Sequence, residues 1–165
     1  MSVPLLTVGL GELLHSGDPQ AVLVTYGLGS CVAVTVYDSR TRAGAMAHIV
    51  LPVSPEGEGA TAGGPAKYAD RAIEALVQVM RGYGAPPSRL IVKIAGGARV
   101  LNFPGAGAQW GIGERNVAAV RELLHKFGLP LVAADVGGNY GRTMRFYLAS
   151  GRVVISTAGR GEKEI

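Results

Sequence analysis

The stretch CVAVTVYDSRTRAGAMAHIVL, residues 31–51, contains two apolar segments on either side of a polar turn. In the first segment, Cys31–Asp38, valine alternates with other side chains, and the second segment covers Ala43–Leu51. Alternation with a period of two and enrichment in β-branched residues are typical of strands. The turn, Ser39–Arg42, is short enough to join the two strands directly. We therefore predict a β-hairpin.

The predicted hairpin brings a cysteine and a histidine to the same face. If the turn has four residues, Asp38 faces Ala43, and Ala33 then faces His48. Cys31 lies two residues before Ala33 and therefore on the same face as His48, at a diagonal Cα spacing of about 7–8 Å. A slip of one residue would place the two side chains on opposite faces. The pairing is thus a geometric hypothesis that a structure can test.

The flanking sequence predicts further strands and two helices. Apolar and β-branched clusters bounded by turn residues predict strands at Ala21–Thr25, Leu90–Ala95, Leu131–Val136, Arg142–Leu148 and Val153–Ser156, the last two as a hairpin. One helix is expected to begin at Pro65, with an apolar stripe of Ala69, Ala72, Ile73, Leu76, Val77 and Met80. A second helix is expected over Glu114–Phe127.

Two helices and about seven strands, several joined as hairpins, indicate an α+β fold. We predict a layered α/β sandwich in which the two main helices pack on mixed or antiparallel β-sheets, in a single domain over residues 1–165. The order of elements does not fit a doubly wound nucleotide-binding fold.

Composition narrows the classes of protein. Of the 165 residues, 48% are hydrophobic, but no apolar run is long enough to span a bilayer. We therefore expect a soluble, cytoplasmic protein without direct membrane insertion. The net charge is +4, but the basic residues are scattered and only 6% of the chain is aromatic, which argues against nucleic-acid binding. The sequence has one cysteine, three scattered histidines and no complete nucleotide-binding motif. We therefore expect neither a bound metal ion nor a cofactor.

Cys31 has two competing interpretations. A free cysteine is most often a buried packing residue, whereas a thiol near an imidazole can act as a nucleophile, with a third polar group orienting the imidazole. Thr25, which precedes a predicted turn at Gly27–Ser30 and is expected to be folded back by it toward Cys31, is a candidate for that group. His15, assigned to a polar loop, and His125, on the polar side of the second helix, have no such neighbours. The residues alone leave both a Cys/His hydrolase and a structural cysteine open.

The motifs Gly27-Leu28-Gly29-Ser30-Cys31-Val32 and His48-x-x-Leu51-Pro52, at this separation, resemble those of the CheD family. This family comprises the chemoreceptor glutamine deamidases of bacterial and archaeal chemotaxis. Further segments match it in the same order: Lys67-Tyr68-Ala69-Asp70, Lys93-Ile94-Ala95-Gly96-Gly97-Ala98, Ile112-Gly113-x-Arg115-Asn116 and Gly137-Gly138-Asn139. The resemblance covers nearly the whole chain.

The resemblance implies a cysteine amidohydrolase with Cys31 as the nucleophile, His48 as the base and Thr25 as the third member of the catalytic set. Gly29 and Ser30 would belong to the oxyanion loop, with backbone N–H groups around Ser30 and Cys31 as donors. The implied reaction converts receptor glutamines to glutamates through a thioester and so tunes chemotactic adaptation. The implied fold is similar to that of deamidating bacterial toxins.

The resemblance also implies two kinds of partner, the cytoplasmic helices of chemotaxis receptors and the phosphatase CheC. It leaves open a regulatory binding module that acts mainly through its complex with CheC, or a receptor methyl-ester hydrolase that uses the same nucleophile. We interpret the glycine-rich loops at residues 53–64 and 102–113 as the walls of a groove that admits a receptor helix.

Overall fold

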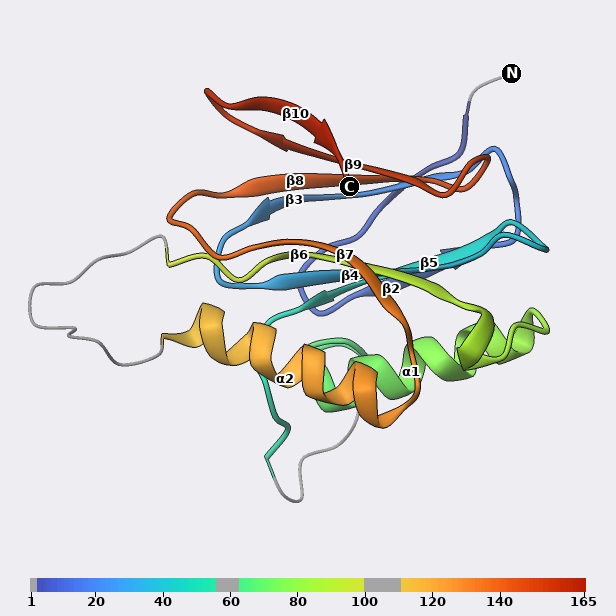
Figure 1. Cartoon of the computed structure of the whole chain (residues 1–165), viewed down its shortest axis with the longest axis horizontal. Helices are drawn as coiled ribbons and strands as arrows, with labels where there is room; N and C mark the ends of the chain where they lie inside the picture. The colour runs from blue at the N-terminus through green and yellow to red at the C-terminus, as the bar shows by residue number, and fades with distance from the viewer. Residues whose placement is uncertain (1–2, 56–62, 100–110) are drawn as a thin grey trace, which may run out of the picture.

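The computed structural model describes residues 3–55, 63–99 and 111–165. Figure 1 shows three stacked layers: an outer β-sheet, a central β-sheet, and two helices that cover the free face of the central sheet. This is the predicted α+β sandwich, with helices packed on sheets of mixed strand direction. Neither helix has both the length and the apolar character needed to cross a membrane, and the described residues contain no other helix that does.

The central sheet has five strands in the order β2-β5-β4-β6-β7. The only parallel pair within it is β6–β7. Its strands are β2 (Leu13–Ser16), β4 (Val32–Asp38), β5 (Ala43–Ile49), β6 (Ile91–Gly96) and β7 (Leu131–Val136).

The outer sheet also has five strands, in the order β1-β3-β8-β9-β10, and β1 pairs with β3 in parallel. Its strands are β1 (Leu5–Thr7), β3 (Val22–Leu28), β8 (Arg142–Tyr147), β9 (Arg152–Thr157) and β10 (Gly161–Glu164). The predicted hairpin near the C-terminus corresponds to β8 and β9.

The predicted hairpin of residues 31–51 is confirmed as β4 and β5, with Asp38 paired to Ala43 and Ala33 paired to His48. Every residue of both strands is buried, because helices cover one face of the central sheet and the outer sheet covers the other. Cys31 itself lies one position before β4 rather than within it.

The two helices are α1 (Ala69–Gly82) and α2 (Ile112–Lys126), and a short 3-10 helix spans Pro87–Arg89. All six residues of the predicted stripe on α1 are buried. However, α1 begins at Ala69, not at Pro65. The backbone before Ala69 pairs elsewhere: the Ala66 N–H donates to Gly11 O, and Lys67 O accepts from two N–H groups after β5, so these residues cannot form a first helical turn.

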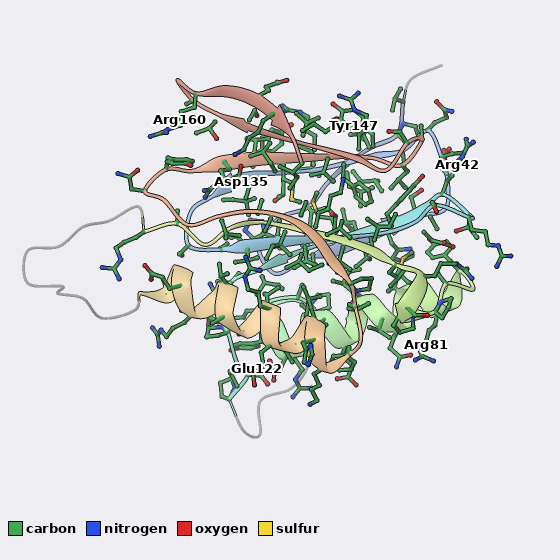
Figure 2. All side chains as sticks on the ribbon, in the orientation of Figure 1. Arg42, Arg81, Glu122, Asp135, Tyr147 and Arg160 are labelled. Carbon is green, nitrogen blue, oxygen red and sulfur yellow. The ribbon has the colours of Figure 1, made fainter. Side chains whose placement is uncertain are left out.

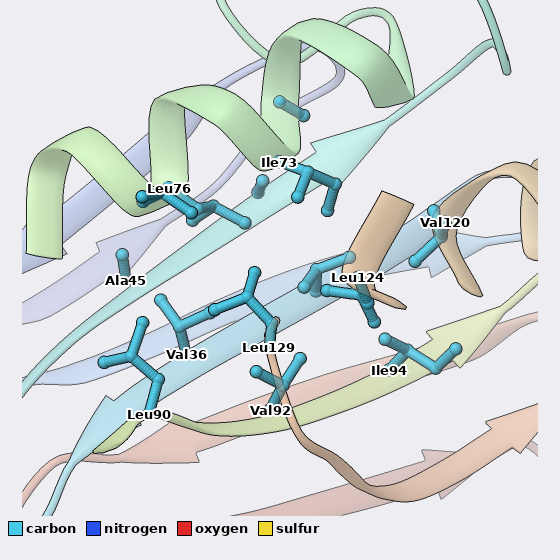
Figure 3. Close-up of a cluster of buried hydrophobic side chains, with 14 of the residues drawn as sticks. Val36, Ala45, Ile73, Leu76, Leu90, Val92, Ile94, Val120, Leu124 and Leu129 are labelled. Atoms are coloured by element: carbon cyan, nitrogen blue, oxygen red, sulfur yellow. The ribbon is translucent and has the colours of Figure 1, made fainter. Parts of the chain in front are cut away.

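Two hydrophobic cores separate the three layers, and Figure 2 shows their side chains filling both spaces while Arg42, Arg81 and Glu122 lie at the periphery. In the core between the helices and the central sheet, Ile73 and Leu76 of α1 and Val120 and Leu124 of α2 face strand residues such as Val36 (Figure 3). The core between the two sheets includes Leu23, Met46, Met144 and Phe146.

Three strands were not predicted: β1, β2 and β10. They have three or four residues each, too few for a period of two to be recognised, and β10 is exposed along its whole length. His15 therefore lies in β2 rather than in a loop. The predicted turn at Gly27–Ser30 is also shorter, because β3 continues to Leu28 past an irregularity after Thr25.

Residues 56–62 and 102–110, which make up most of the two glycine-rich loops, lie outside the described part of the chain. Residues 100 and 101, just before the second loop, also lie outside it.

Candidate active site

Thr25 and His48 meet in the space between the two sheets. Thr25 comes from β3 of the outer sheet, and His48 comes from β5 of the central sheet. The Thr25 Oγ1 atom lies 2.7 Å from His48 Nδ1, and both side chains are buried. The sequence analysis expected the turn after Thr25 to fold it back toward Cys31; in the structure Thr25 lies in the outer sheet and contacts His48 of the central sheet across the space between them.

The hydrogen bonds of Thr25 determine which nitrogen of His48 carries the proton. The Thr25 hydroxyl donates to Val8 O at 2.6 Å and, having only one proton, must accept a hydrogen bond from His48. His48 Nδ1 is therefore the protonated nitrogen. His48 Nε2 carries the lone pair, and this buried atom has no hydrogen-bond partner among the described residues. An imidazole held in this way is able to accept a proton at Nε2.

Cys31 approaches the same space from the start of β4. Its side chain is half-buried and packs against the core between the sheets, the side on which His48 also lies. Since Ala33 pairs with His48, the register places Cys31 diagonally across from the imidazole, as predicted. The thiol thus lies on the face toward which His48 is directed.

Burial pushes both groups toward their neutral forms. It lowers the pKa of His48 from its ordinary 6.5, with the Val8 carbonyl acting in the opposite direction. It also raises the pKa of the Cys31 thiol from its ordinary 9.0, against the effect of its own backbone N–H. These directions favour a neutral thiol and a neutral imidazole near neutral pH.

The turn that carries Cys31 is fixed through three consecutive carbonyl groups. The Ala98 N–H donates to Gly29 O at 2.8 Å, and the Gly97 N–H donates to Cys31 O at 2.8 Å. Between them, Asn116 Nδ2 donates to Ser30 O at 2.9 Å. The backbone of the predicted oxyanion loop is thus held by the two residues that follow β6 on one side and by α2 on the other.

Gly96 allows this close approach of β6 to Cys31. Its φ of +114° belongs to a region that side-chain-bearing residues rarely adopt. A Cβ atom there would also overlap the carbonyl oxygen of Cys31. The first glycine of the pair in the KIAGGA segment is therefore required by backbone geometry next to the candidate nucleophile.

Asn116 is the site residue to which the sequence analysis assigned no role. It is fully buried on α2, and a second hydrogen bond joins its Nδ2 to Val50 O at 2.9 Å. The sequence did contain a signal: Asn116, Val120 and Leu124 follow one another at intervals of four, so a polar amide occupies a position on the apolar stripe of a helix.

The remaining histidines are not part of this arrangement. His15 Nδ1 lies 2.6 Å from the Tyr83 hydroxyl at an exposed position, and His125 is exposed on α2. Within the described ranges, no group of three or more His, Cys, Asp or Glu side chains is placed to hold a metal ion.

Comparisons with known proteins agree on one family. The family model described as CheD chemotactic sensory transduction matches residues 50–157. A protein from Symbiobacterium thermophilum named probable chemoreceptor glutamine deamidase CheD is 52% identical over 158 residues, covering 96% of this chain and 95% of the relative. A protein of the same name from Caldanaerobacter subterraneus is 42% identical and covers 100% of both chains.

One solved structure shares the fold at low sequence identity. The crystal structure of a Neisseria meningitidis protein of the DUF152 family superposes with a TM-score of 0.50 at 12% identity. The match covers 84% of this chain and 65% of that one, and it extends to the fold alone.

Proposed function

Because this chain belongs to the CheD family, we propose that it is a protein-glutamine deamidase that acts on chemoreceptors with Cys31 as its nucleophile. The observation that carries the proposal is the state of His48. Thr25 holds the proton on Nδ1, and the unpartnered Nε2 lone pair is available on the face that Cys31 shares. The names of the relatives support a glutamine side chain of a receptor as the substrate.

In the first half of the proposed reaction, His48 Nε2 takes the thiol proton as Cys31 Sγ attacks the carbonyl carbon of the glutamine side chain. The carbonyl oxygen becomes an oxyanion, and backbone N–H groups at Ser30 and Cys31 are suited to stabilise it. The imidazolium then returns the proton to the amide nitrogen. Ammonia leaves, and a thioester joins the receptor to Cys31.

In the second half, His48 is again neutral and removes a proton from a water molecule that attacks the thioester carbonyl. The tetrahedral intermediate expels the Cys31 sulfur, which recovers its proton from His48. The sum is glutamine plus water giving glutamate plus ammonia, with the enzyme unchanged. Thr25 remains hydrogen-bonded to Nδ1 throughout and stabilises the imidazolium when it forms.

This chemistry fits a role in adaptation. Conversion of glutamine to glutamate changes the charge of a receptor helix and creates a methylation site. We propose that residues 1–165 act as one deamidase domain in the cytoplasm, where the receptor helices are accessible.

A second role is compatible with the same site. A regulatory partner such as the phosphatase CheC would occupy the deamidase by presenting a receptor-like surface, and binding of this kind does not need the thiol. Hydrolysis of a receptor methyl ester would need it, since the same nucleophile and the same thioester would be used.

Deamidation of a receptor cytoplasmic fragment tests the proposal directly. Mass spectrometry should detect a gain of about 1 Da for each glutamine converted, and Cys31→Ala and His48→Asn should each lower the rate by several orders of magnitude. His15→Asn is the matched control, because His15 is an exposed histidine of the same sheet, and its rate should equal that of the wild type. Full activity in Cys31→Ala would refute the role of Cys31 as the nucleophile. Binding of CheC by Cys31→Ala would support the regulatory role separately.

A further inference from the structure

The side chain of Asn116 joins the ends of the two strands that carry the candidate catalytic groups. Its Nδ2 donates to Ser30 O, just before β4, and to Val50 O, just after β5, at 2.9 Å in each case. The orientation of this amide follows from its partners: both are carbonyl oxygens, which only accept, so the NH₂ group must face them. Asn116 Oδ1 is left buried without a partner among the described residues.

The hydrogen bond to Ser30 O determines the direction of a second group. The carbonyl of Ser30 and the N–H of Cys31 belong to one planar trans peptide unit, in which they point in opposite directions. Fixing the Ser30 carbonyl toward Asn116 therefore fixes the Cys31 N–H away from it. The same reasoning applies to the preceding unit, where the Ala98 N–H holds Gly29 O and so orients the Ser30 N–H.

The Ser30 and Cys31 N–H groups belong to the turn that carries the candidate nucleophile. Burial raises the pKa of the Cys31 thiol, and its own backbone N–H acts in the opposite direction. In the described part of the chain, neither the Ser30 N–H nor the Cys31 N–H donates to a backbone carbonyl. These two donors are thus available next to the position where the oxygen of a tetrahedral intermediate on sulfur would form.

We propose that Asn116 is a positioning residue for the oxyanion hole, which it builds indirectly by setting the plane of the Ser30–Cys31 peptide. This inference rests on the proposed deamidase function, since it concerns the oxyanion of that reaction. Asn116 does not touch the substrate. Its bond to Val50 O, two residues after His48, keeps the nucleophile turn in register with the strand that carries the base.

Two variants remove the donor in different ways. Asn116→Asp preserves the shape but presents a carboxylate to two carbonyl oxygens, and Asn116→Leu removes the donor without introducing charge. Gln78→Glu is the matched control, because it makes the same amide-to-carboxylate change at an exposed position of α1. Each protein is assayed for kcat and KM on the receptor fragment, for thermal unfolding, and for alkylation of its cysteine by iodoacetamide across pH.

Alkylation separates an oxyanion role from a general structural one. Iodoacetamide reacts by displacement of iodide and forms no tetrahedral oxyanion, so its rate reports only the access and ionisation of the thiol. Cys31 is the only cysteine in the sequence, so the readout is unambiguous. Loss of an oxyanion donor lowers kcat by roughly 10²-fold to 10³-fold.

We expect Asn116→Asp and Asn116→Leu to lower kcat by about 10²-fold, with KM and the alkylation profile within about threefold of wild type. Gln78→Glu should match wild type in every assay. Unchanged kcat, or alkylation that falls in parallel with kcat, would overturn the inference. If one of the two Asn116 variants does not fold, the kcat and alkylation rate of the other variant test the inference. A wild-type protein that releases no ammonia would instead refute the deamidase function, and the two failures are distinguishable.

Discussion

Thr25 has one proton to donate and lone pairs that accept, and both capacities are used. The proton goes to Val8 O, and a lone pair receives the His48 Nδ1–H. The side chain therefore selects a tautomer without contributing charge. A carboxylate in this position would also raise the pKa of the imidazole, whereas a neutral hydroxyl leaves the effect of burial dominant.

Removal of this hydroxyl should therefore impair catalysis while leaving the fold intact. Thr25→Val preserves the shape of the side chain but frees the imidazole to change tautomer, and we expect kcat to fall by roughly 10-fold to 100-fold, with recovery in Thr25→Ser. Thr35→Val is the matched control, because Thr35 is also a buried strand threonine and its hydroxyl donates to Lys93 O, away from His48. Equal kcat values for Thr25→Val and Thr35→Val would contradict this assignment.

The neutral thiol–imidazole pair predicts a bell-shaped pH dependence of kcat/KM. Protonation of His48 removes the base, and because burial lowers its pKa, the acidic limb should lie below pH 6.5. In the proposed reaction, ionisation of Cys31 before attack would leave His48 without the proton that departing ammonia needs. Because burial raises the thiol pKa, the alkaline limb should lie above pH 9.0.

Initial rates of ammonia release at substrate concentrations below KM would give this profile. Alkylation of Cys31 should show the same alkaline midpoint, since it reports the thiolate directly. A thiolate already present below pH 6.5 would mean that the resting state is an ion pair, contrary to the neutral pair.

At the scale of elements, the β4–β5 hairpin and the β6 strand together determine the position of Cys31, the proposed nucleophile. The hairpin register follows from its four-residue turn and its alternating pattern, which is why it was predictable. The contact between β6 and Cys31 was not predictable. It depends on the positive φ of Gly96 and on the pairing of β6 with β4. The sequence showed a glycine pair after a strand but not what it lies against.

Substitution of Gly96 tests this contact. Gly96→Ala forces a Cβ against the Cys31 carbonyl, and we expect both lower stability and a loss of kcat of at least about 10-fold, because small displacements of a reacting group are costly. Gly84→Ala is the matched control: Gly84 has a φ of +81° but open space around it, so the backbone strain is retained without the overlap. It should lower the unfolding temperature and leave kcat unchanged. Equal kcat values for the two variants would argue against the contact.

At the scale of the whole molecule, every layer contributes to the site. The outer sheet provides Thr25, the central sheet provides Cys31 and His48, and the helix layer provides Asn116. The layers are also joined by a buried ion pair between Arg142 Nε of β8 and Asp135 Oδ1 of β7, at 2.9 Å. Figure 2 shows Asp135 between the two sheets, and Arg142 donates in addition to Gly137 O and Gly96 O.

Breaking this pair should destabilise the stacking of the sheets. Arg142→Leu leaves the buried Asp135 carboxylate with Lys163 as its remaining ion-pair partner, and we expect the free energy of unfolding to fall by roughly 3 kcal/mol. The double variant Arg142→Leu/Asp135→Leu removes both charges and should be more stable than Arg142→Leu alone. Urea unfolding curves of the wild type and the variants measure the difference. If Arg142→Leu is as stable as the wild type, the Arg142–Asp135 ion pair does not hold the sheets together.

Local patterns in the sequence determined the hairpin and its faces, the stripe on α1, and the motifs that resemble the family, because a period of two or of four needs only neighbouring residues to be recognised. Only the tertiary structure decided how Thr25 reaches His48, which nitrogen of His48 is free, and that Asn116 donates a hydrogen bond to the carbonyl group before Cys31. Each of these depends on how separate sheets and a helix pack against one another. No periodicity in the chain encodes the distance between two layers, so the sequence could place His48 diagonally across from Cys31 but could not show what the outer sheet and the helices contribute around them.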